Sequence, residues 1–291
     1  MNHNPTRRRI TAAGAALLAS PLWVAPRGAR AEIKSGDNPD GSAIWQKVRA
    51  SFFENRPIVN VGDDVLVLDA PGRAEDAAVV PIAMRSRLPQ TAANHVTKLT
   101  LVIDNNPSPI SAIFAFTPHS GRADIETRVR VDEYSFVRAI AETSDGRLLM
   151  RARFVKASGG CSAPPGKDPQ AALASLGKIR LRVDGDVVLN QATLAQLMIS
   201  HPNDSGLAMD QVTRTYATPH FVRKVDVRYA GKPIMSADID FSISENPNFR
   251  FYFTPGDGGA LEATVVDNHD LQFNTALKLD SGRATAATAA R

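Results

Sequence analysis

Short stretches in which apolar and polar residues alternate, each bounded by turn-forming residues, recur between residues 57 and 280 and constrain the fold more than any other feature. A period of two residues is typical of β-strands. Because almost no helical periodicity lies between these stretches, they favour antiparallel sandwiches over an α/β sheet. The predicted strands are residues 65–68, 79–84, 98–103, 112–116, 127–131, 136–141, 148–155, 178–183, 194–200, 221–229, 234–243, 249–254, 261–267 and 271–279.

Two segments predict short helices. Ser42 is a suitable N-cap for a helix over residues 43–53, in which Trp45 and Val48 share an apolar face. A second short helix is predicted over residues 170–176. Both are brief compared with the strand-rich remainder, so the chain is predicted to be all-β.

The composition excludes two classes of protein. With 43% hydrophobic and 22% charged residues, the chain has the balance of a folded globular protein, which excludes disorder throughout. No apolar run reaches the ~20 residues that a transmembrane helix needs, which excludes a membrane bundle.

The amino-terminal segment has the three zones of an export signal. Arg7-Arg8-Arg9 precedes an apolar zone over residues 10–24, and Ala29-Arg30-Ala31 forms a small-x-small cleavage site. The arginines favour the twin-arginine route, with an ordinary secretory signal as the alternative. Either route predicts a periplasmic protein.

The positive charge of the chain belongs largely to this signal. Residues 1–31 contain five arginines and no acids, so cleavage takes the net charge from +4 to −1. A nucleic-acid partner therefore loses its electrostatic support.

These patterns divide the chain into five segments. They are a signal peptide over residues 1–31, a first β-sandwich over 32–157, a flexible linker over 158–176, a second β-sandwich over 177–280 and a flexible tail over 281–291.

Cys161 is the only cysteine and the main candidate for chemistry. It follows Gly159 and Gly160 in a segment without large apolar neighbours, which predicts an exposed thiol on a pliable segment. Lys156 and Lys167 are candidates for favouring its thiolate form. Two alternatives stay open, a cysteine buried in a core and an exposed thiol that forms an intermolecular disulfide.

No other motif indicates a catalytic or cofactor site. The sequence lacks G-x-S-x-G, P-loop, H-E-x-x-H and C-x-x-C patterns, and we expect no cofactor. The five histidines after the signal are not spaced as local metal ligands, so no metal is expected unless distant histidines converge.

A weak internal echo marks both halves. Asn106-Pro107 and Asn246-Pro247 each precede a phenylalanine-rich strand, which reflects either a repeat or a recurrent way to begin a strand. The alternating phenylalanines are predicted to lie in the core. They are Phe114, Phe116, Phe249, Phe251 and Phe253.

The chain resembles the SoxY and SoxZ subunits of the bacterial sulfur-oxidising carrier complex, fused in one polypeptide. The SoxY-like features are the twin-arginine-like signal, the Trp45 helix, Asp104-Asn-Asn-Pro107-Ser-Pro109, Thr127-Arg-Val-Arg130-Val131 and Gly159-Gly160-Cys161. The SoxZ-like residues are His201-Pro202, Ser205-Gly206, Pro219-His-Phe-Val-Arg-Lys-Val225, Gly231-Lys-Pro-Ile234, Ser242-Ile-Ser-Glu-Asn-Pro247 and Asp267-Asn268. The resemblance is strongest to fused carriers associated with quinoprotein (PQQ) alcohol dehydrogenases.

This resemblance implies two immunoglobulin-like antiparallel β-sandwich domains joined by a flexible Cys-bearing loop. It implies that Cys161 is the attachment site for a sulfur intermediate and that Gly159 and Gly160 are the hinge of the arm. Periplasmic redox and hydrolytic proteins would load and unload the cysteine. Here the chain continues after Cys161, so the arm is tethered at both ends and its reach is shorter than that of a free tail.

Three functional hypotheses follow. The first is a periplasmic covalent carrier that uses Cys161 and has no turnover of its own. The second is a binding or assembly module for a quinoprotein dehydrogenase, with an incidental cysteine. The third is an enzyme with a cysteine nucleophile, which lacks a base nearby in sequence.

Overall fold

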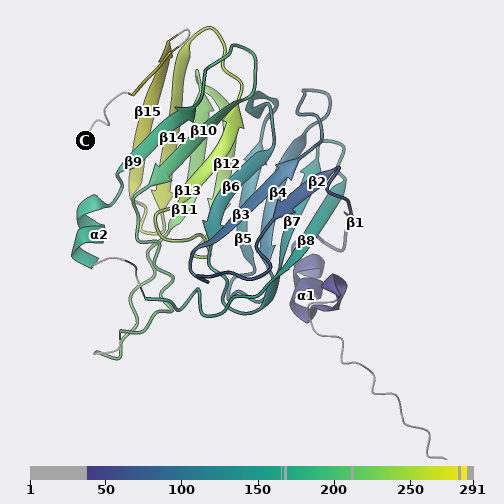
Figure 1. Cartoon of the computed structure of the whole chain (residues 1–291), viewed down its shortest axis with the longest axis vertical. Helices are drawn as coiled ribbons and strands as arrows, with labels where there is room; N and C mark the ends of the chain where they lie inside the picture. Colours follow the sequence, from purple (N-terminus) through teal and green to yellow (C-terminus); the bar gives the residue numbers. More distant parts are fainter. Residues whose placement is uncertain (1–37, 165, 167–168, 211–212, 281–282, 287–291) are drawn as a thin grey trace, which may run out of the picture. The chain divides into compact units, whose positions relative to one another are not determined.

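The computed structural model describes residues 38–164, 166, 169–210, 213–280 and 283–286. Within these residues most regular structure is β-strand, arranged in two sheets, and the helices are short (Figure 1). The predicted signal peptide lies outside the described residues. No helix in the described part of the chain is long and apolar enough to cross a membrane.

The helical elements are η1 (Pro39–Gly41), α1 (Ala43–Ser51), η2 (Pro118–Ser120) and α2 (Pro169–Ser175). The strands before α2 are β1 (Ile58–Asn60), β2 (Leu66–Asp69), β3 (Val80–Ser86), β4 (Val96–Ile103), β5 (Ile110–Phe116), β6 (Asp124–Val129), β7 (Ser135–Thr143) and β8 (Leu148–Val155). The strands after α2 are β9 (Ile179–Asp184), β10 (Thr193–Ile199), β11 (Val222–Tyr229), β12 (Lys232–Ile239), β13 (Asn248–Phe253), β14 (Gly259–Asp267), β15 (Gln272–Asp280) and β16 (Arg283–Ala286).

Each half divides its strands between the two sheets in the same way. In the first half, β2, β3 and β6 lie in one sheet, and β8, β7, β4 and β5 lie in the other. In the second half, β9, β10 and β13 join the first sheet, and β15, β14, β11 and β12 join the second. The first, second and fifth strands of each half therefore face the third, fourth, sixth and seventh, a division found in immunoglobulin-like sandwiches.

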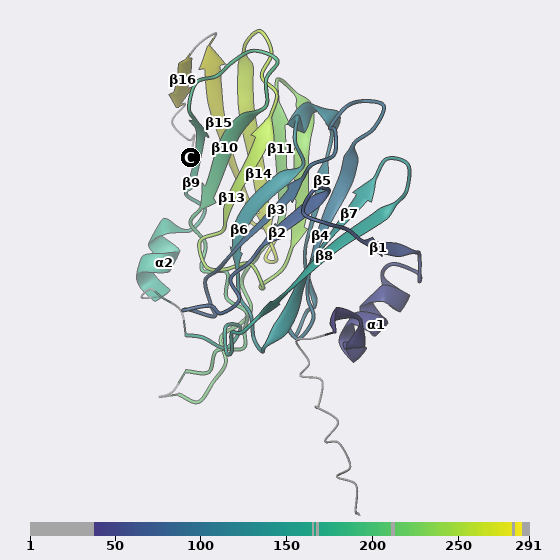
Figure 2. The ribbon, with the colours of Figure 1, turned by 45° about the vertical axis from the view of Figure 1, so that its right-hand side comes forward.

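The two halves join edge to edge through both sheets. The strand β5 pairs antiparallel with β12, and β6 pairs antiparallel with β13, where Arg250 lies opposite Glu126. The result is a ten-stranded sheet facing a six-stranded sheet, with the strands of both halves side by side in Figure 2. We call the β5–β12 and β6–β13 pairs the seam.

The main core lies between the two sheets and continues across the seam. All five predicted phenylalanines are buried in it. Phe114 of the ten-stranded sheet meets Phe249 of the six-stranded sheet edge to face, with 6.0 Å between ring centroids. This contact joins residues of both halves, so the core is continuous across the boundary between them.

The helix α1 packs on the other face of the ten-stranded sheet. Ser42 caps it, because its hydroxyl accepts a hydrogen bond from the Trp45 N–H at 3.1 Å. Trp45 and Val48 form a second apolar cluster with Ile140 and Leu148 of the sheet. The apolar face predicted for this helix therefore covers the outer face of the ten-stranded sheet.

A buried ion pair lies beneath α1. The Arg138 guanidinium donates to both Asp104 carboxylate oxygens at 2.7 and 2.6 Å, and both side chains are almost fully buried. The same guanidinium donates to the Pro39 carbonyl at 2.6 Å and lies 4.4 Å from the centroid of the Trp45 ring. One charged pair thus connects the sheet with the segment that leads into α1.

Every predicted strand is present, with ends displaced by a few residues. Two strands were not predicted. The strand β1 has only three residues, too few to show alternation, and it pairs in parallel with β8. The strand β16 pairs with β15 within the segment that we expected to be a flexible tail, and the rest of 281–291 lies outside the described residues.

The Asn-Pro echo does not mark equivalent strands. Asn106-Pro107 precedes β5, the fourth strand of its sandwich, whereas Asn246-Pro247 precedes β13, the fifth strand of the other. The echo is therefore a recurrent strand beginning, and the structural repeat pairs β2–β8 with β9–β15 instead. Both sheets contain strands from both halves, so sheet membership does not divide the chain into domains. The predicted domain boundaries at 157/158 and 176/177 therefore stay predictions.

We expect Asp104→Asn to lower the free energy of unfolding by about 3–5 kcal/mol, because Arg138 would stay buried without its counter-charge. Urea unfolding followed by circular dichroism measures this loss. Asp270→Asn is the matched control, since it breaks an exposed pair with Arg223 and should leave the midpoint nearly unchanged. Equal effects of both variants would contradict the role of the buried pair.

Candidate functional site

The segment that carries Cys161 is docked along the chain that follows β6. Gly159 has a φ of +79°, and its N–H donates to the Asp132 carbonyl at 2.7 Å. The Gly160 N–H donates to the Val131 carbonyl at 3.1 Å. A Cβ at Gly160 would lie 2.1 Å from the Ala77 carbonyl oxygen, so only glycine fits this approach.

Cys161 itself is fully buried. Its N–H donates to the Asp132 carboxylate at 3.2 Å, and its carbonyl accepts a hydrogen bond from the Ser205 hydroxyl at 2.5 Å. It belongs to neither apolar cluster of the described residues. We call Ala77, Val131, Asp132 and Ser205, which hold Gly160 and Cys161, the cysteine seat.

The cysteine seat is built from both halves of the chain. Ala77, Val131 and Asp132 belong to the first half, and Ser205 lies between β10 and β11 of the second. The backbone N–H of Asp132 donates to the Asn106 side chain at 2.9 Å. The seat therefore exists only where the two halves meet.

Asn106 fastens this region across the seam. Its amide nitrogen donates to the Arg130 carbonyl at 2.8 Å and to the Ser242 hydroxyl of the second half at 3.1 Å. The Arg130 guanidinium reaches the same loop and donates to the Phe241 and Ile243 carbonyls. This gives a structural reason for asparagine in the first Asn-Pro pair.

Burial raises the pKa of the Cys161 thiol to about 12. The Asp132 carboxylate raises it further, the Arg130 guanidinium lowers it, and the Asp240 carboxylate raises it. Burial also raises the pKa of Asp240 to about 6. A docked Cys161 is therefore a neutral thiol at pH 7, in the form that reacts least with electrophiles and oxidants.

The predicted exposed thiol is wrong, because Cys161 is fully buried. The residues next to Cys161 have small side chains. Because of this, the segment can pack closely against the backbone carbonyls of Ala77 and Val131. Lys156 is exposed, and among the described residues it is not one of the charges that shift the pKa of this thiol. Lys167 lies outside the described residues, so its predicted role stays a prediction.

The segment after Cys161 is also held. The Ser162 hydroxyl donates to the Gly159 carbonyl at 3.4 Å, and the Gly166 N–H donates to the Glu245 carboxylate at 2.9 Å. Helix α2 then begins at Pro169 and leads into β9. The arm is thus attached at both ends, as the sequence predicts, while hinge motion at Gly159 and Gly160 stays a prediction.

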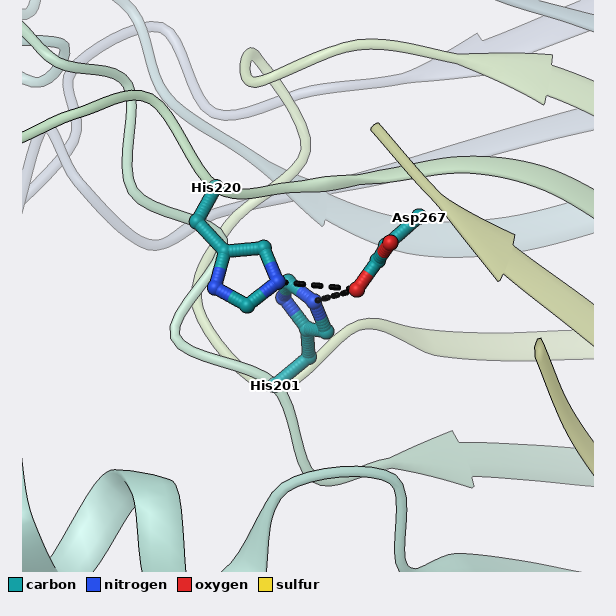
Figure 3. Close-up of side chains that lie close together, drawn as sticks. All are labelled: His201, His220 and Asp267. Atoms are coloured by element: carbon teal, nitrogen blue, oxygen red, sulfur yellow. Dashed lines mark hydrogen bonds and ion pairs between the residues drawn. The ribbon is translucent and has the colours of Figure 1, made fainter. Parts of the chain in front are cut away.

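A second polar cluster lies close by in the second half (Figure 3). The Asp267 carboxylate oxygen Oδ2 is 2.8 Å from His220 Nε2 and 3.5 Å from His201 Nε2. His269 stacks on the His220 ring, with 4.1 Å between centroids. These histidines are distant in sequence, so their convergence was the alternative that the spacing left open.

The position of the proton on the His201 ring favours a hydrogen-bonded cluster over a metal-binding site. The three ligand atoms lie within 4.8 Å of one another. However, His201 Nδ1 accepts a hydrogen bond from the Asn203 N–H at 3.0 Å, so the proton of the neutral ring is on Nε2, which donates to Asp267. A metal-bound histidine usually has the reverse arrangement, with Nδ1 as the donor.

Burial and the neighbouring His220 lower the pKa of His201 to about 4, so this ring is neutral at pH 7. Burial opposes the charge of Asp267, but hydrogen bonds from His220 and from the Leu271 and His269 N–H groups hold its pKa below the ordinary value. The centre of the cluster is thus the anionic Asp267 carboxylate, which accepts hydrogen bonds from the surrounding groups.

This cluster supports the cysteine seat. The backbone of His220 pairs with Asp204 through two hydrogen bonds of 2.7 and 3.1 Å, next to Ser205. Asn203 continues the link, because its side chain donates to the Ile243 carbonyl and accepts from the Val222 N–H. The family-like motifs contain His201, Ser205, His220 and Asp267, but the sequence spacing of these residues does not show that they meet.

Two family models match the chain in succession. They are the sulfur oxidation protein SoxY over residues 49–161 and the sulphur oxidation protein SoxZ over residues 181–278. A search of curated proteins finds no match.

Two solved structures each match part of the chain. The sulfur carrier protein SoxY from Chlorobium limicola f thiosulfatophilum is 23% identical, covers 39% of this chain and 90% of its own, and has a TM-score of 0.33. A superoxide reductase (neelaredoxin) from Ignicoccus hospitalis is 16% identical, covers 36% of this chain and 97% of its own, and has a TM-score of 0.31.

The fold and site define a protein of two fused immunoglobulin-like sandwiches with a glycine-cysteine segment docked where they meet. The SoxY match ends at Cys161 and the SoxZ match follows it. The chain belongs to the SoxY and SoxZ families and joins them in one SoxYZ-like polypeptide. By family it is a sulfur-oxidation carrier.

We expect Cys161 to react slowly with iodoacetamide in the native protein, because a neutral buried thiol offers little thiolate. At pH 8 the rate, followed by mass spectrometry, should be at least about a hundredfold below that of the urea-unfolded chain. Ser205→Ala should raise the native rate about fivefold, because it removes the hydrogen bond of about 1 kcal/mol that holds the Cys161 carbonyl.

Ser162→Ala is the matched control, because its hydroxyl is exposed and its hydrogen bond is long. Rapid alkylation of the wild type, with a rate that levels off near the ordinary thiol pKa, would contradict the docked arrangement. So would equal effects of the two serine variants.

We expect the free energy of unfolding to fall as pH falls from about 6.5 to about 4. The folded-state pKa of His201 is lowered to about 4, so the unfolded chain binds a proton in this window that the folded chain does not. The contribution is at most about 1.4 kcal/mol per pH unit. Urea unfolding at several pH values should show a smaller slope for His201→Gln, and an unchanged slope would contradict this assignment.

Proposed function

We propose that the protein is a periplasmic covalent carrier that holds a sulfur-containing intermediate on Cys161 and presents it to partner oxidoreductases or hydrolases. One observation carries this proposal. The SoxY match ends at Cys161, and this cysteine lies outside both apolar clusters of the described residues, where Asp132 and Ser205 hydrogen-bond its backbone. A cysteine held there by a few hydrogen bonds can be both sheltered and released.

Within the described residues, hydrogen bonds and the burial of Cys161 stabilise the docked arm. Four hydrogen bonds hold Gly159, Gly160 and Cys161 to the seat, and each contributes about 1 kcal/mol. A partner that binds only the released arm therefore needs a preference of a few kcal/mol to shift the population. Gly159 and Gly160 are the proposed hinge, since glycine accepts the backbone angles of both states.

Release would also change the chemistry of the thiol. Docking raises the pKa of Cys161 through burial and through Asp132, and both influences end when the arm leaves the seat. The released thiol then ionises nearer its ordinary pKa and becomes a nucleophile. The docked state protects the thiol, and the released state reacts.

Loading by disulfide formation requires an external oxidant. Joining the Cys161 thiol to a second thiol forms one S–S bond, breaks two S–H bonds, and releases two protons and two electrons. The chain has a single cysteine and so cannot accept these electrons by thiol exchange within itself. The two-electron acceptor is therefore assigned to a partner oxidoreductase.

The periplasmic location rests on residues 1–31. Their arginines, apolar zone and small-x-small end support export, with the twin-arginine route preferred. A quinoprotein dehydrogenase system is one proposed setting for the partners. The proposal assigns no turnover to the carrier itself.

The second candidate function is a binding or assembly module for a quinoprotein dehydrogenase. One observation favours it, namely that Cys161 is fully buried and its pKa is raised to about 12. In that case the cysteine is incidental and the sandwich surfaces bind the partner.

Cys161→Ser separates the two functions. In the carrier, intact-mass spectrometry of protein from its host should show an adduct on the wild type that is absent from the variant. Pathway activity should be lost although the unfolding midpoint is unchanged. An unmodified wild-type thiol together with a fully active Cys161→Ser strain would favour the binding module.

A further inference from the structure

A hollow of about 410 Å³ lies on the outer face of the six-stranded sheet at the seam. Cross-strand register explains it, because Ala83 of β3 lies between Asp69 of β2 and Glu126 of β6, and Glu126 lies opposite Arg250 of β13. The short Ala83 side chain leaves space between these longer neighbours. Both halves of the chain therefore line the hollow.

The floor and one wall of the hollow are apolar. Pro81 and Ala83 point to the outer face on β3, and Pro71 follows β2. In the register of β3 with β6, Pro81 lies opposite Arg128. A ligand in the hollow would thus contact rigid apolar groups on one side and a guanidinium on the other.

Three arginines and two carboxylates line the hollow, and Arg250 also pairs at 3.4 Å with Asp184, which lies outside the lining. Arg85 and Arg250 share Glu126, with nitrogen–oxygen distances of 2.8 and 3.3 Å. Asp69 lies 3.8 Å from Arg85, at the limit of an ion pair. Arg128 is the third arginine, and within the described residues no carboxylate forms an ion pair with it.

Among the described residues, the Arg128 side chain has one hydrogen-bond acceptor, and its Nε is buried without a partner. One guanidinium nitrogen donates to the Asn246 carbonyl at 3.2 Å, which orients the side chain. A guanidinium has five N–H donors in a planar fork that matches the oxygens of a carboxylate or of a tetrahedral oxyanion. A cation placed beside two partly neutralised arginines is a suitable anion-binding group.

We propose that this hollow is a binding site for a small oxyanion, either an inorganic one or the carboxylate of an organic acid, with Arg128 as its anchor. Arg85 and Arg250 supply the surrounding positive charge, and Pro81 and Ala83 contact the body of the ligand. The site is distinct from the cysteine seat and does not depend on the function of Cys161.

Isothermal titration calorimetry of the full mature chain tests this site with sodium sulfate and sodium acetate as separate probes. Sodium chloride at matched ionic strength is the reference, because salts also act on stability by general exclusion. Saturable heat with sulfate alone identifies an inorganic oxyanion, and saturable heat with acetate identifies a carboxylate site. Either result supports the proposal.

Variants locate the binding. Arg128→Gln should weaken the bound probe by about tenfold or more, because it removes a charge-assisted hydrogen bond. Asp69→Asn removes a nearby negative charge and should tighten binding severalfold. Arg223→Gln is the matched control, since it removes an exposed arginine from the other sheet.

Two results would overturn the proposal. One is the absence of saturable heat with both probes. The other is binding that Arg128→Gln and Asp69→Asn leave equal to that of the wild type. Should Arg128→Gln fail to fold, Asp69→Asn decides alone, because its side chain is largely exposed and its loss adds positive charge without removing packing.

Discussion

Backbone pairing at the seam is the interaction on which the rest of the structure depends. A sandwich that stands alone leaves strand edges with unpaired N–H and C=O groups. Here the fourth strands of the two halves, β5 and β12, pair with each other, and so do the fifth strands, β6 and β13. Because the pairing occurs in both sheets, the core continues across the boundary and each half fixes the position of the other.

The candidate sites follow from this pairing. Asp132 and Ser205 reach Cys161 from opposite halves. Asn106 joins the segment of Asp132 to Ser242 in the β12–β13 loop, and Asn203 joins the loop of Ser205 to Ile243 in that same loop. The hollow around Arg128 also needs β6 and β13 in register. If the halves were apart, neither one alone would form the cysteine seat or the hollow. The geometry therefore agrees with the succession of a SoxY and a SoxZ match in one chain.

Local patterns predicted the strands, whereas the surroundings of the cysteine could not be predicted. The period of two residues is present within each strand, and the N-cap at Ser42 needs only its own helix. The burial of Cys161 depends on Ala77 and Ser205, which are far from it in sequence. Glycine permits both an exposed arm and a close approach to backbone, so Gly160 could not decide between them.

The cysteine seat and the segment that carries Cys161 belong to one polypeptide. The docking of Cys161 should therefore not depend on the protein concentration. In the proposed release of the arm, the return of Cys161 to Asp132 and Ser205 would be an intramolecular event, so its equilibrium would not change when the protein is diluted. In a carrier made of two chains, dilution separates the subunits and removes the shelter. The fused chain would keep its thiol protected at low copy number, where an assembly of separate subunits would leave it open to oxidants.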